Sequence, residues 1–253
     1  MKNTNVLKWV NVGATVAMIV VNALANALPL NGLNTGEISD RFEVYFVPAG
    51  YVFSIWGLIY LALLAFTIYQ LTPHSAHTRE RIGYWYALSA VANVAWIFLW
   101  HYEVFPLTLI AMLVLLGSLI AIYLRLGIGK RRPAASERWP VHFPFSLYLG
   151  WITVATVANV TSLLDYLNWG GWGIAPEAWA VIMLIVAAGV ALAVSFTRGD
   201  IAYIAVIVWA YIGIAVKHGS TPVVAIPATV LATLVGLSLI VTVPRVRRCL
   251  VDA

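Results

Sequence analysis

Eight apolar stretches separated by short polar segments constrain this chain more than any other feature of its sequence. They cover about residues 9–30, 46–71, 83–100, 107–128, 143–164, 177–196, 201–216 and 222–243. A helix needs roughly 20 apolar residues to cross a bilayer, and only the stretch at 201–216 is clearly shorter. The sequence therefore predicts an all-α fold, a polytopic membrane helical bundle of about eight transmembrane helices.

Composition points to the same class of protein. The chain is 62% hydrophobic and 10% charged, whereas soluble domains carry about 25% charged residues. We therefore expect the lipid bilayer as a partner and no nucleic acid, and we assign the net charge of +5 to loops. Cys249 is the only cysteine, so an intrachain disulfide is excluded and a cysteine-based metal site is not expected.

The charges divide between alternate loops. With the N-terminus in the cytoplasm, all Lys and Arg residues except Arg41 and Lys217 fall on the cytoplasmic side. Most acidic residues fall outside: Glu37, Asp40, Glu43, Glu103, Asp165 and Glu177. Positive charge is retained on the cytoplasmic side of membranes, so both termini are predicted to be cytoplasmic. Cleavage of a signal peptide near residues 23–27 is an alternative, but the apolar run continues to Leu30.

The predicted helix centres hold no Asp, Glu, Lys, Arg or His. Ionisable groups inside a membrane usually mark ion or proton pathways, so their absence counts against an ion-coupled transporter. The histidines fall near helix ends, and the pair His74 and His77 lacks an evident third ligand. We therefore expect no metal site.

Aromatic residues gather at the start of the second apolar stretch. Pro48 and Gly50 mark a turn, and Tyr51 follows it directly. Phe53, Trp56 and Tyr60 have the spacing i, i+3, i+7, which places them on one helix face. Two interpretations remain open: helix packing with an interfacial aromatic belt, or the wall of a pocket for a flat apolar ligand.

Two further faces combine asparagine with tryptophan. Asn93, Trp96 and Trp100 share a face of the third predicted helix, and Trp151, Ala155 and Asn159 share one of the fifth. Hydrogen bonds between helices explain Asn159 taken alone. Three such faces together favour a shared pocket.

These motifs resemble the tryptophan-rich sensory protein family, also called the translocator protein (TspO) or peripheral benzodiazepine receptor family. The family's Pro-Pro-x-Trp-x-Phe turn becomes Pro48-Ala49-Gly50-Tyr51-Val52-Phe53, followed by Trp56 and Ile59-Tyr60. Its Leu-Asn-x-x-Trp motif becomes Ala92-Asn93-Val94-Ala95-Trp96. Its fifth-helix motif becomes Trp151, Ala155, Thr156 and Asn159. The resemblance covers about the first two-thirds of the chain.

The resemblance implies a five-helix core, expected at residues 1–168, with three additional helices and a basic tail at 169–253. It also implies a pocket for a flat hydrophobic small molecule such as a porphyrin, with a tetrapyrrole as ligand rather than a resident cofactor, and a sensory or regulatory role. The expected ligand-binding residues are Pro48, Tyr51, Phe53, Trp56, Asn93, Trp96, Trp151, Ala155 and Asn159. The setting would be a bacterial plasma membrane.

Two departures from the family pattern bear on the ligand. Ala49 and Tyr51 replace the second proline and the tryptophan of the turn, and no Lys or Arg closely follows Tyr166, so sterol binding is not expected. A membrane transporter, a porphyrin-degrading enzyme and a structural protein are the alternatives, although the sequence offers no nucleophile or general base. The polar segment 31–45 is either a lid or a simple connector, and small residues in the helices would allow a homodimer.

Overall fold

The protein is a helical bundle, seen here in a computed structural model that describes residues 2–28 and 30–249. Five long helices form a ring: α1 (Lys2–Ala27), α3 (Ile55–Gln70), α5 (Trp85–His101), α6 (Phe105–Leu126) and α8 (Phe143–Tyr166). The helix α1 packs on α3 and α5, α5 packs on α6, α6 packs on α8, and α8 packs on α3. The ring encloses a core of apolar and aromatic side chains.

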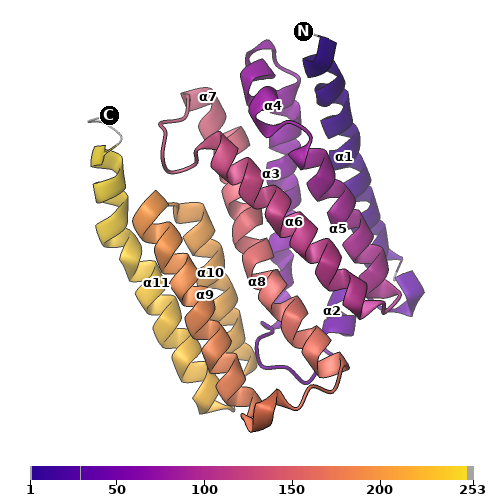
Figure 1. The fold of residues 1–253 in the computed structure, drawn as a ribbon, viewed down its shortest axis with the longest axis vertical. Coiled ribbons are helices and arrows are strands. Elements are labelled where there is room, and N and C mark those ends of the chain that lie inside the picture. Colours follow the sequence, from indigo (N-terminus) through magenta and orange to yellow (C-terminus); the bar gives the residue numbers. More distant parts are fainter. Residues whose placement is uncertain (1, 29, 250–253) are drawn as a thin grey trace.

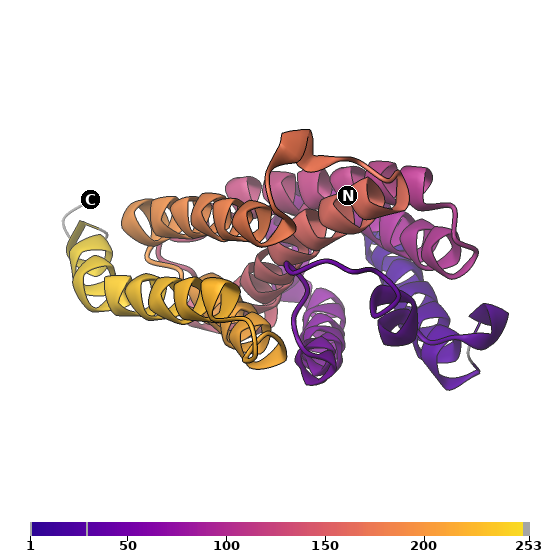
Figure 2. The ribbon, with the colours of Figure 1, turned by 90° about the horizontal axis from the view of Figure 1, so that it is seen from below.

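Three further helices stand beside this ring (Figures 1 and 2). They are α9 (Pro176–Arg198), α10 (Ile201–Lys217) and α11 (Pro222–Cys249). They pack on one another, and α10 carries the main contact with α8. Gly150 makes this contact close, because a Cβ there would lie 3.1 Å from the carbonyl oxygen of Tyr203.

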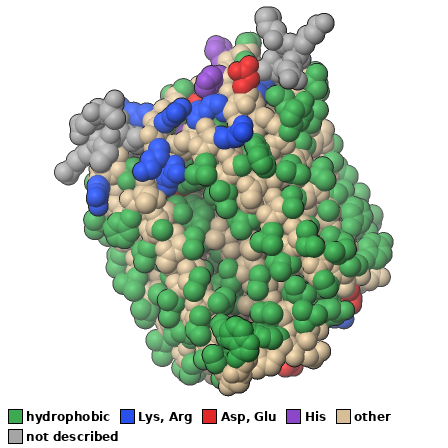
Figure 3. All heavy atoms as spheres, in the orientation of Figure 1, with side chains coloured by type: hydrophobic (Ala, Val, Ile, Leu, Met, Phe, Trp, Pro, Cys, Tyr) green, Lys and Arg blue, Asp and Glu red, His purple; other side chains and the backbone are tan. Residues whose placement is uncertain are grey.

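The helices have the lengths and surfaces of membrane spans. Within the described residues, six helices are long and apolar enough to cross a bilayer, and the segments Pro73–Ile82 and Trp85–His101, bent by 66°, qualify as a pair. With the shorter α10, these elements coincide with the eight predicted stretches. Apolar side chains cover most of the face seen in Figure 3 between the two ends of the bundle, as a lipid-facing surface requires. The prediction of a polytopic all-α membrane bundle is thus confirmed.

Charge separates the two ends of the bundle. Lys and Arg side chains gather at one end of the bundle, where α1 starts and α11 finishes (Figures 1 and 3). We call this the basic end. The opposite end, here the acidic end, carries Glu37, Asp40, Glu103, Asp165 and Glu177 in its loops and helix starts.

The second predicted helix begins later than the apolar pattern suggests. Residues 46–49 are not helical, η2 (Gly50–Ser54) is a 3₁₀ turn, and the α-helix begins only at Ile55. The backbone N–H of Ala49 donates to the carbonyl oxygen of Gly213 at 3.1 Å. The Ala49 N–H is thus bonded to α10 and not within a helix of its own segment. Pro48 has no backbone N–H and therefore cannot donate a helical hydrogen bond.

The polar segment after α1 contains short helices. They are η1 (Leu30–Gly32) and α2 (Thr35–Ser39). Asn34 caps α2 in a capping box, in which its side chain accepts from the N–H of Glu37 and the Glu37 carboxylate accepts from the N–H of Asn34. The remaining short elements lie at the ends of the bundle: η3 (Pro73–Ser75), α4 (Ala76–Ile82), α7 (Ala135–Glu137), η4 (Arg138–His142) and η5 (Gly171–Gly173).

Candidate functional site

A cavity of about 490 Å³ opens at the acidic end between α1, α2, α3 and α5. Its volume falls in the range of about 300–1,000 Å³ that is usual for small-molecule sites. Phe53, Trp56 and Tyr60 form an aromatic wall, and Asn22 and Asn26 of α1 supply amides. The other lining residues are Asn34, Thr35, Gly36, Glu37, Asp40, Gly50 and Ile97.

The aromatic wall is held rigid by ring contacts. Trp56 stacks on Tyr60 with 5.4 Å between ring centroids. Trp151 of α8 meets Phe53 at 5.7 Å and Trp56 at 6.1 Å, both edge to face. Such pairs contribute about 0.5–1.5 kcal/mol each beyond area burial, so the wall is organised without a ligand. The predicted shared face of Phe53, Trp56 and Tyr60 is confirmed.

Two donors next to this wall have no partner. The Tyr60 hydroxyl and the Trp151 indole N–H are both buried, and neither has a hydrogen-bond partner among the described residues. A buried polar group left unpaired costs about 1–3 kcal/mol. Native interiors satisfy most such groups, so both are unusual; Tyr60 is a lining residue of the cavity, whereas Trp151 is not.

The amides opposite the wall form a chain of hydrogen bonds. Asn22 donates to the side-chain oxygen of Asn93 at 2.7 Å, and Asn93 donates to the Tyr148 hydroxyl at 3.0 Å. Asn26 accepts from the backbone N–H of Thr35 at 3.3 Å, which ties α1 to α2. Asn93 is 1% exposed and therefore lies behind the cavity wall, where it orients Asn22.

The rim of the cavity carries two carboxylates. Glu37 is engaged by the backbone N–H of Asn34 at 2.7 Å. Asp40 accepts from the ammonium group of Lys217 at 2.8 Å, so the end of α10 reaches the rim. The rim therefore disfavours a ligand that presents its own negative charge there.

The segment 31–49 connects the cavity with the rest of the acidic end. The indole N–H of Trp100 donates to the carbonyl oxygen of Thr35 at 3.2 Å. Tyr45 donates to Glu177 of α9 at 2.8 Å. Together with the Asp40–Lys217 and Ala49–Gly213 contacts, these bonds join the segment to α5 of the ring and to α9 and α10.

The predicted ligand residues fall into two groups. Phe53 and Trp56 line the cavity, and Trp151 supports them from behind. Asn93 is linked to the cavity through Asn22. Pro48 is buried against α10, where a Cβ added to Gly213 would lie 3.1 Å from the Cβ of Pro48, and it does not line the cavity.

The other predicted residues lie away from this cavity. Tyr51 is 46% exposed and meets Trp209 edge to face at 5.3 Å. Trp96 donates to Asn159 at 3.2 Å, and Asn159 donates to Thr108 at 2.9 Å. The interpretation of Asn159 as a link between helices is therefore confirmed. Ala155 is partly buried and packs on the hydrophobic core.

Sequence reasoning missed Asn22 and Asn26. The sequence contains a pattern that could have identified them. Polar residues recur at spacings of four and seven along a mostly apolar helix, at Asn11, Thr15, Asn22 and Asn26, and this spacing places them on one helix face. The buried members of this stripe bond across to α3 and α5, as Asn11 does to Gln70 at 2.7 Å and Asn22 does to Asn93 at 2.7 Å. In the part of the chain that the structure describes, no three His, Cys, Asp or Glu side chains are grouped to hold a metal ion.

Five apolar helices form a ring with an aromatic and amide-lined cavity at one end, and three more helices join it. This architecture defines a helical membrane protein. The family model described as TSPO-like protein matches residues 8–241, and the chain belongs to this family. The match extends through α9 and α10 and into α11. No curated protein and no solved structure matches the chain.

Proposed function

We propose that this membrane protein binds a flat hydrophobic small molecule in the cavity at the acidic end, and that binding serves a sensory or regulatory role. The observation that carries the proposal is the aromatic wall of Phe53, Trp56 and Tyr60 with the unpartnered Tyr60 hydroxyl. Planar rings stack on such a wall, and a single acceptor on the ligand would satisfy the hydroxyl.

A tetrapyrrole is our first candidate for the ligand. Its ring system would lie against Trp56 and Tyr60, while Asn22 and Asn26 would orient polar atoms at its edge. The carboxylates of Glu37 and Asp40 line the same cavity, so acidic substituents of a porphyrin would be repelled there and would point toward solvent. A neutral porphyrin is therefore expected to bind at least as tightly as a dicarboxylate.

The segment 31–49 could transmit ligand binding to other parts of the protein. It carries α2 at the cavity and contacts α5, α9 and α10 through Thr35, Tyr45 and Asp40. A ligand that binds more tightly with α2 in one position shifts the population of that position. We thus favour a lid over a simple connector, and binding over catalysis. We place the basic end in the cytoplasm of a bacterial cell on the positive-inside rule.

The test is a titration of the purified full-length protein with protoporphyrin and with its dimethyl ester. The ligand's own absorbance and fluorescence serve as the readout, because the chain has 11 tryptophans. Trp56→Leu and Tyr60→Phe should weaken binding, Trp56→Leu by about tenfold or more. Tyr51→Phe, the same change as Tyr60→Phe outside the cavity, should leave binding unchanged.

Several outcomes would count against the proposal. Binding that is equal in the wild type, Trp56→Leu and Tyr51→Phe would exclude this cavity as the tetrapyrrole site. Accumulation of the ligand in sealed vesicles would instead indicate a membrane transporter, and a new product spectrum would indicate an enzyme.

A further inference from the structure

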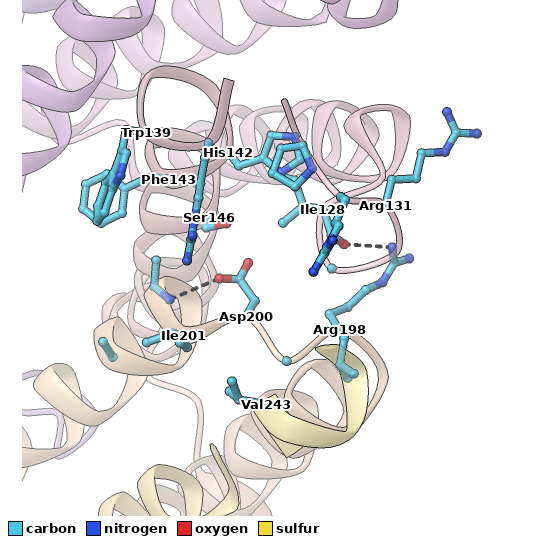
Figure 4. A pocket seen from close by; sticks show the side chains of 18 of the residues that line it. Ile128, Arg131, Trp139, His142, Phe143, Ser146, Arg198, Asp200, Ile201 and Val243 are labelled. Atoms are coloured by element: carbon cyan, nitrogen blue, oxygen red, sulfur yellow. Dashed lines mark hydrogen bonds between the residues drawn. The ribbon is translucent and has the colours of Figure 1, made fainter. Parts of the chain in front are cut away.

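A second cavity, of about 950 Å³, lies at the basic end of the molecule (Figure 4). Its walls come from the loop after α6, the start of α8, the turn between α9 and α10, and the end of α11. It therefore lies where the five-helix ring meets the three C-terminal helices. This cavity is separate from the one at the acidic end and shares no lining residue with it.

The junction that forms this cavity is tightly packed on one side. Gly129 has a φ of +72°, and a Cβ there would lie 2.2 Å from the carbonyl oxygen of Arg198. The Arg198 guanidinium donates to the carbonyl oxygen of Ile128 at 3.1 Å (Figure 4). The loop after α6 is thus fastened to the end of α9, and the cavity is formed before any ligand binds.

Positive charge dominates the lining of the cavity. Arg131, Arg132, Arg138 and Arg198 all contribute to it. Arg131, Arg132 and Arg138 are exposed, and none of them forms an ion pair with a carboxylate among the described residues. Three guanidinium groups are therefore available to an anion, and guanidinium groups bind phosphate oxygens with paired hydrogen bonds.

The single acidic lining residue is already engaged by the protein. One oxygen of Asp200 accepts from the backbone N–H groups of Ala202 and Tyr203 at 3.1 and 3.2 Å. The other accepts from the Tyr123 hydroxyl at 2.9 Å. Asp200 thus caps α10 and stays 8% exposed, so its carboxylate leaves the arginines free for another anion.

Besides the charged residues, the lining contains two polar side chains, His142 and Ser146, and several apolar ones. Phe143, Ile201, Ala205 and Val243 line the cavity. Trp139 also lines it, is 67% exposed, and lies 5.6 Å from the ring of Phe143. Exposed tryptophans of this kind mark the interface between lipid and water. A volume equal to that of about thirty water molecules far exceeds what a lone phosphate fills.

We propose that this cavity binds the headgroup of an anionic phospholipid, with its phosphate on Arg131 and Arg138 and its acyl chains along Phe143, Ala205 and Val243. Basic pockets between membrane helices on the cytoplasmic side suit such headgroups. The lipid would bridge the ring and the C-terminal helices at the basic end. This site goes beyond the proposed binding function and does not depend on it.

The test compares phosphatidylglycerol with phosphatidylcholine on the delipidated full-length protein in a nonionic detergent. Native mass spectrometry counts retained lipids, and the unfolding temperature reports stabilisation. We expect phosphatidylglycerol to be retained at about one molecule per chain and to raise the unfolding temperature, with phosphatidylcholine doing neither. The variant R131Q/R138Q should weaken phosphatidylglycerol binding by about tenfold or more.

Two control variants separate the cavity from the general charge of the basic end. K130Q/R245Q removes two exposed cations at the same end that do not line the cavity, and it should bind phosphatidylglycerol like the wild type. Ala205→Phe keeps every charge but fills part of the cavity, and it should weaken binding. The proposal would be overturned if R131Q/R138Q and K130Q/R245Q lost phosphatidylglycerol affinity equally. It would also be overturned if Ala205→Phe bound phosphatidylglycerol as tightly as the wild type.

Soluble anions distinguish a lipid from a free phosphate compound. Inorganic phosphate and glycerol phosphate at millimolar concentration should neither raise the unfolding temperature nor displace phosphatidylglycerol. Displacement by either one, sensitive to R131Q/R138Q, would assign the cavity to a water-soluble phosphate and overturn the lipid assignment.

Discussion

At the scale of single residues, Tyr60 combines an apolar ring in the aromatic wall with a buried hydroxyl that has no partner. Tyr60→Phe removes only that hydroxyl, so the ligand-free protein should be stabilised by about 1 kcal/mol. Binding of a ligand that accepts from the hydroxyl should weaken about three- to tenfold. Unfolding temperatures with and without ligand measure both effects.

The control for Tyr60 is Tyr51, which is exposed beside Trp209. Tyr51→Phe should change neither the unfolding temperature nor the affinity. A destabilised Tyr60→Phe protein would mean that its hydroxyl has a partner in the ligand-free state, and the argument from the unpaired donor would fail.

His218 provides a prediction on pH. It follows α10, its ring lies 5.1 Å from that of Tyr45, and burial, followed by the charge of Lys217, lowers its pKa below the ordinary 6.5. The unfolded chain then binds a proton at a higher pH than the folded chain does. Stability conferred by the neutral ring is therefore present above pH 6.5 and is lost as the pH falls toward the lower folded pKa.

The measurement for His218 is the unfolding temperature between pH 7.5 and 5.5. The wild type should lose more stability over this interval than His218→Gln, which cannot titrate at this position. His74, His77, His101 and His142 are common to both proteins and cancel in the comparison. Identical pH profiles would show that the His218 ring gains no stability from staying neutral.

At the scale of elements, the contact between η2 and α10 decides where the second membrane helix begins. Gly213 has no side chain, and a Cβ there would lie 2.2 Å from a methyl group of Val52. Gly213→Ala should therefore destabilise the protein by about 1–3 kcal/mol through overpacking. Thermal unfolding checks this magnitude.

Gly189 is the matched control for Gly213, since it lies within α9 and nothing comes within 4 Å of a Cβ added there. Gly189→Ala should be neutral or slightly stabilising, because alanine favours helix over glycine by about 1 kcal/mol. Val52→Ala should restore part of the stability that Gly213→Ala removes. If both alanine variants behave alike, the close approach of η2 to α10 is not a constraint on the fold.

The elements show where apolar patterns predict boundaries well and where they fail. The helix α9 begins and ends within two residues of the predicted 177–196, because Pro176 and Gly199 mark its ends. The segment 46–54 falls within the predicted helix at 46–71, yet residues 46–49 are not helical and residues 50–54 form a 3₁₀ turn. Its hydrogen-bond partner is Gly213, which lies more than 150 residues away, and no local pattern reports such a contact.

At the scale of the whole molecule, the separation of charge between the two ends predicts the orientation in the membrane. Both termini are expected in the cytoplasm, with the cavity of Phe53 and Trp56 on the opposite side. Cys249, the only cysteine, should react with an impermeant thiol reagent in inside-out vesicles and stay unlabelled in right-side-out vesicles. In a Cys249→Ser background, Ser220→Cys should show the reverse pattern. Labelling of both positions from the same side would mean that α11 does not cross the membrane, and would contradict the predicted orientation.

The sequence by itself determined the class of this protein. Eight apolar stretches with charge confined to their ends leave a helical membrane bundle as the fold, because backbone groups in lipid must be paired within helices. The face shared by Phe53, Trp56 and Tyr60 also followed from spacing alone, because residues three apart in a 3₁₀ turn and four apart in an α-helix lie on one side of the helix. The resemblance that these motifs carry led to the family that the chain belongs to.

Only the tertiary structure decided which of the predicted residues meet. Asn93 and Asn159 look alike in sequence, yet Asn93 supports the cavity through Asn22, while Asn159 joins α8 to α5 and α6. The basic cavity is assembled from four separate segments, which no motif connects. The physical reason is that spacing along a helix determines the direction of a side chain, whereas its partner depends on how the helices pack, and packing is a property of the folded chain as a whole.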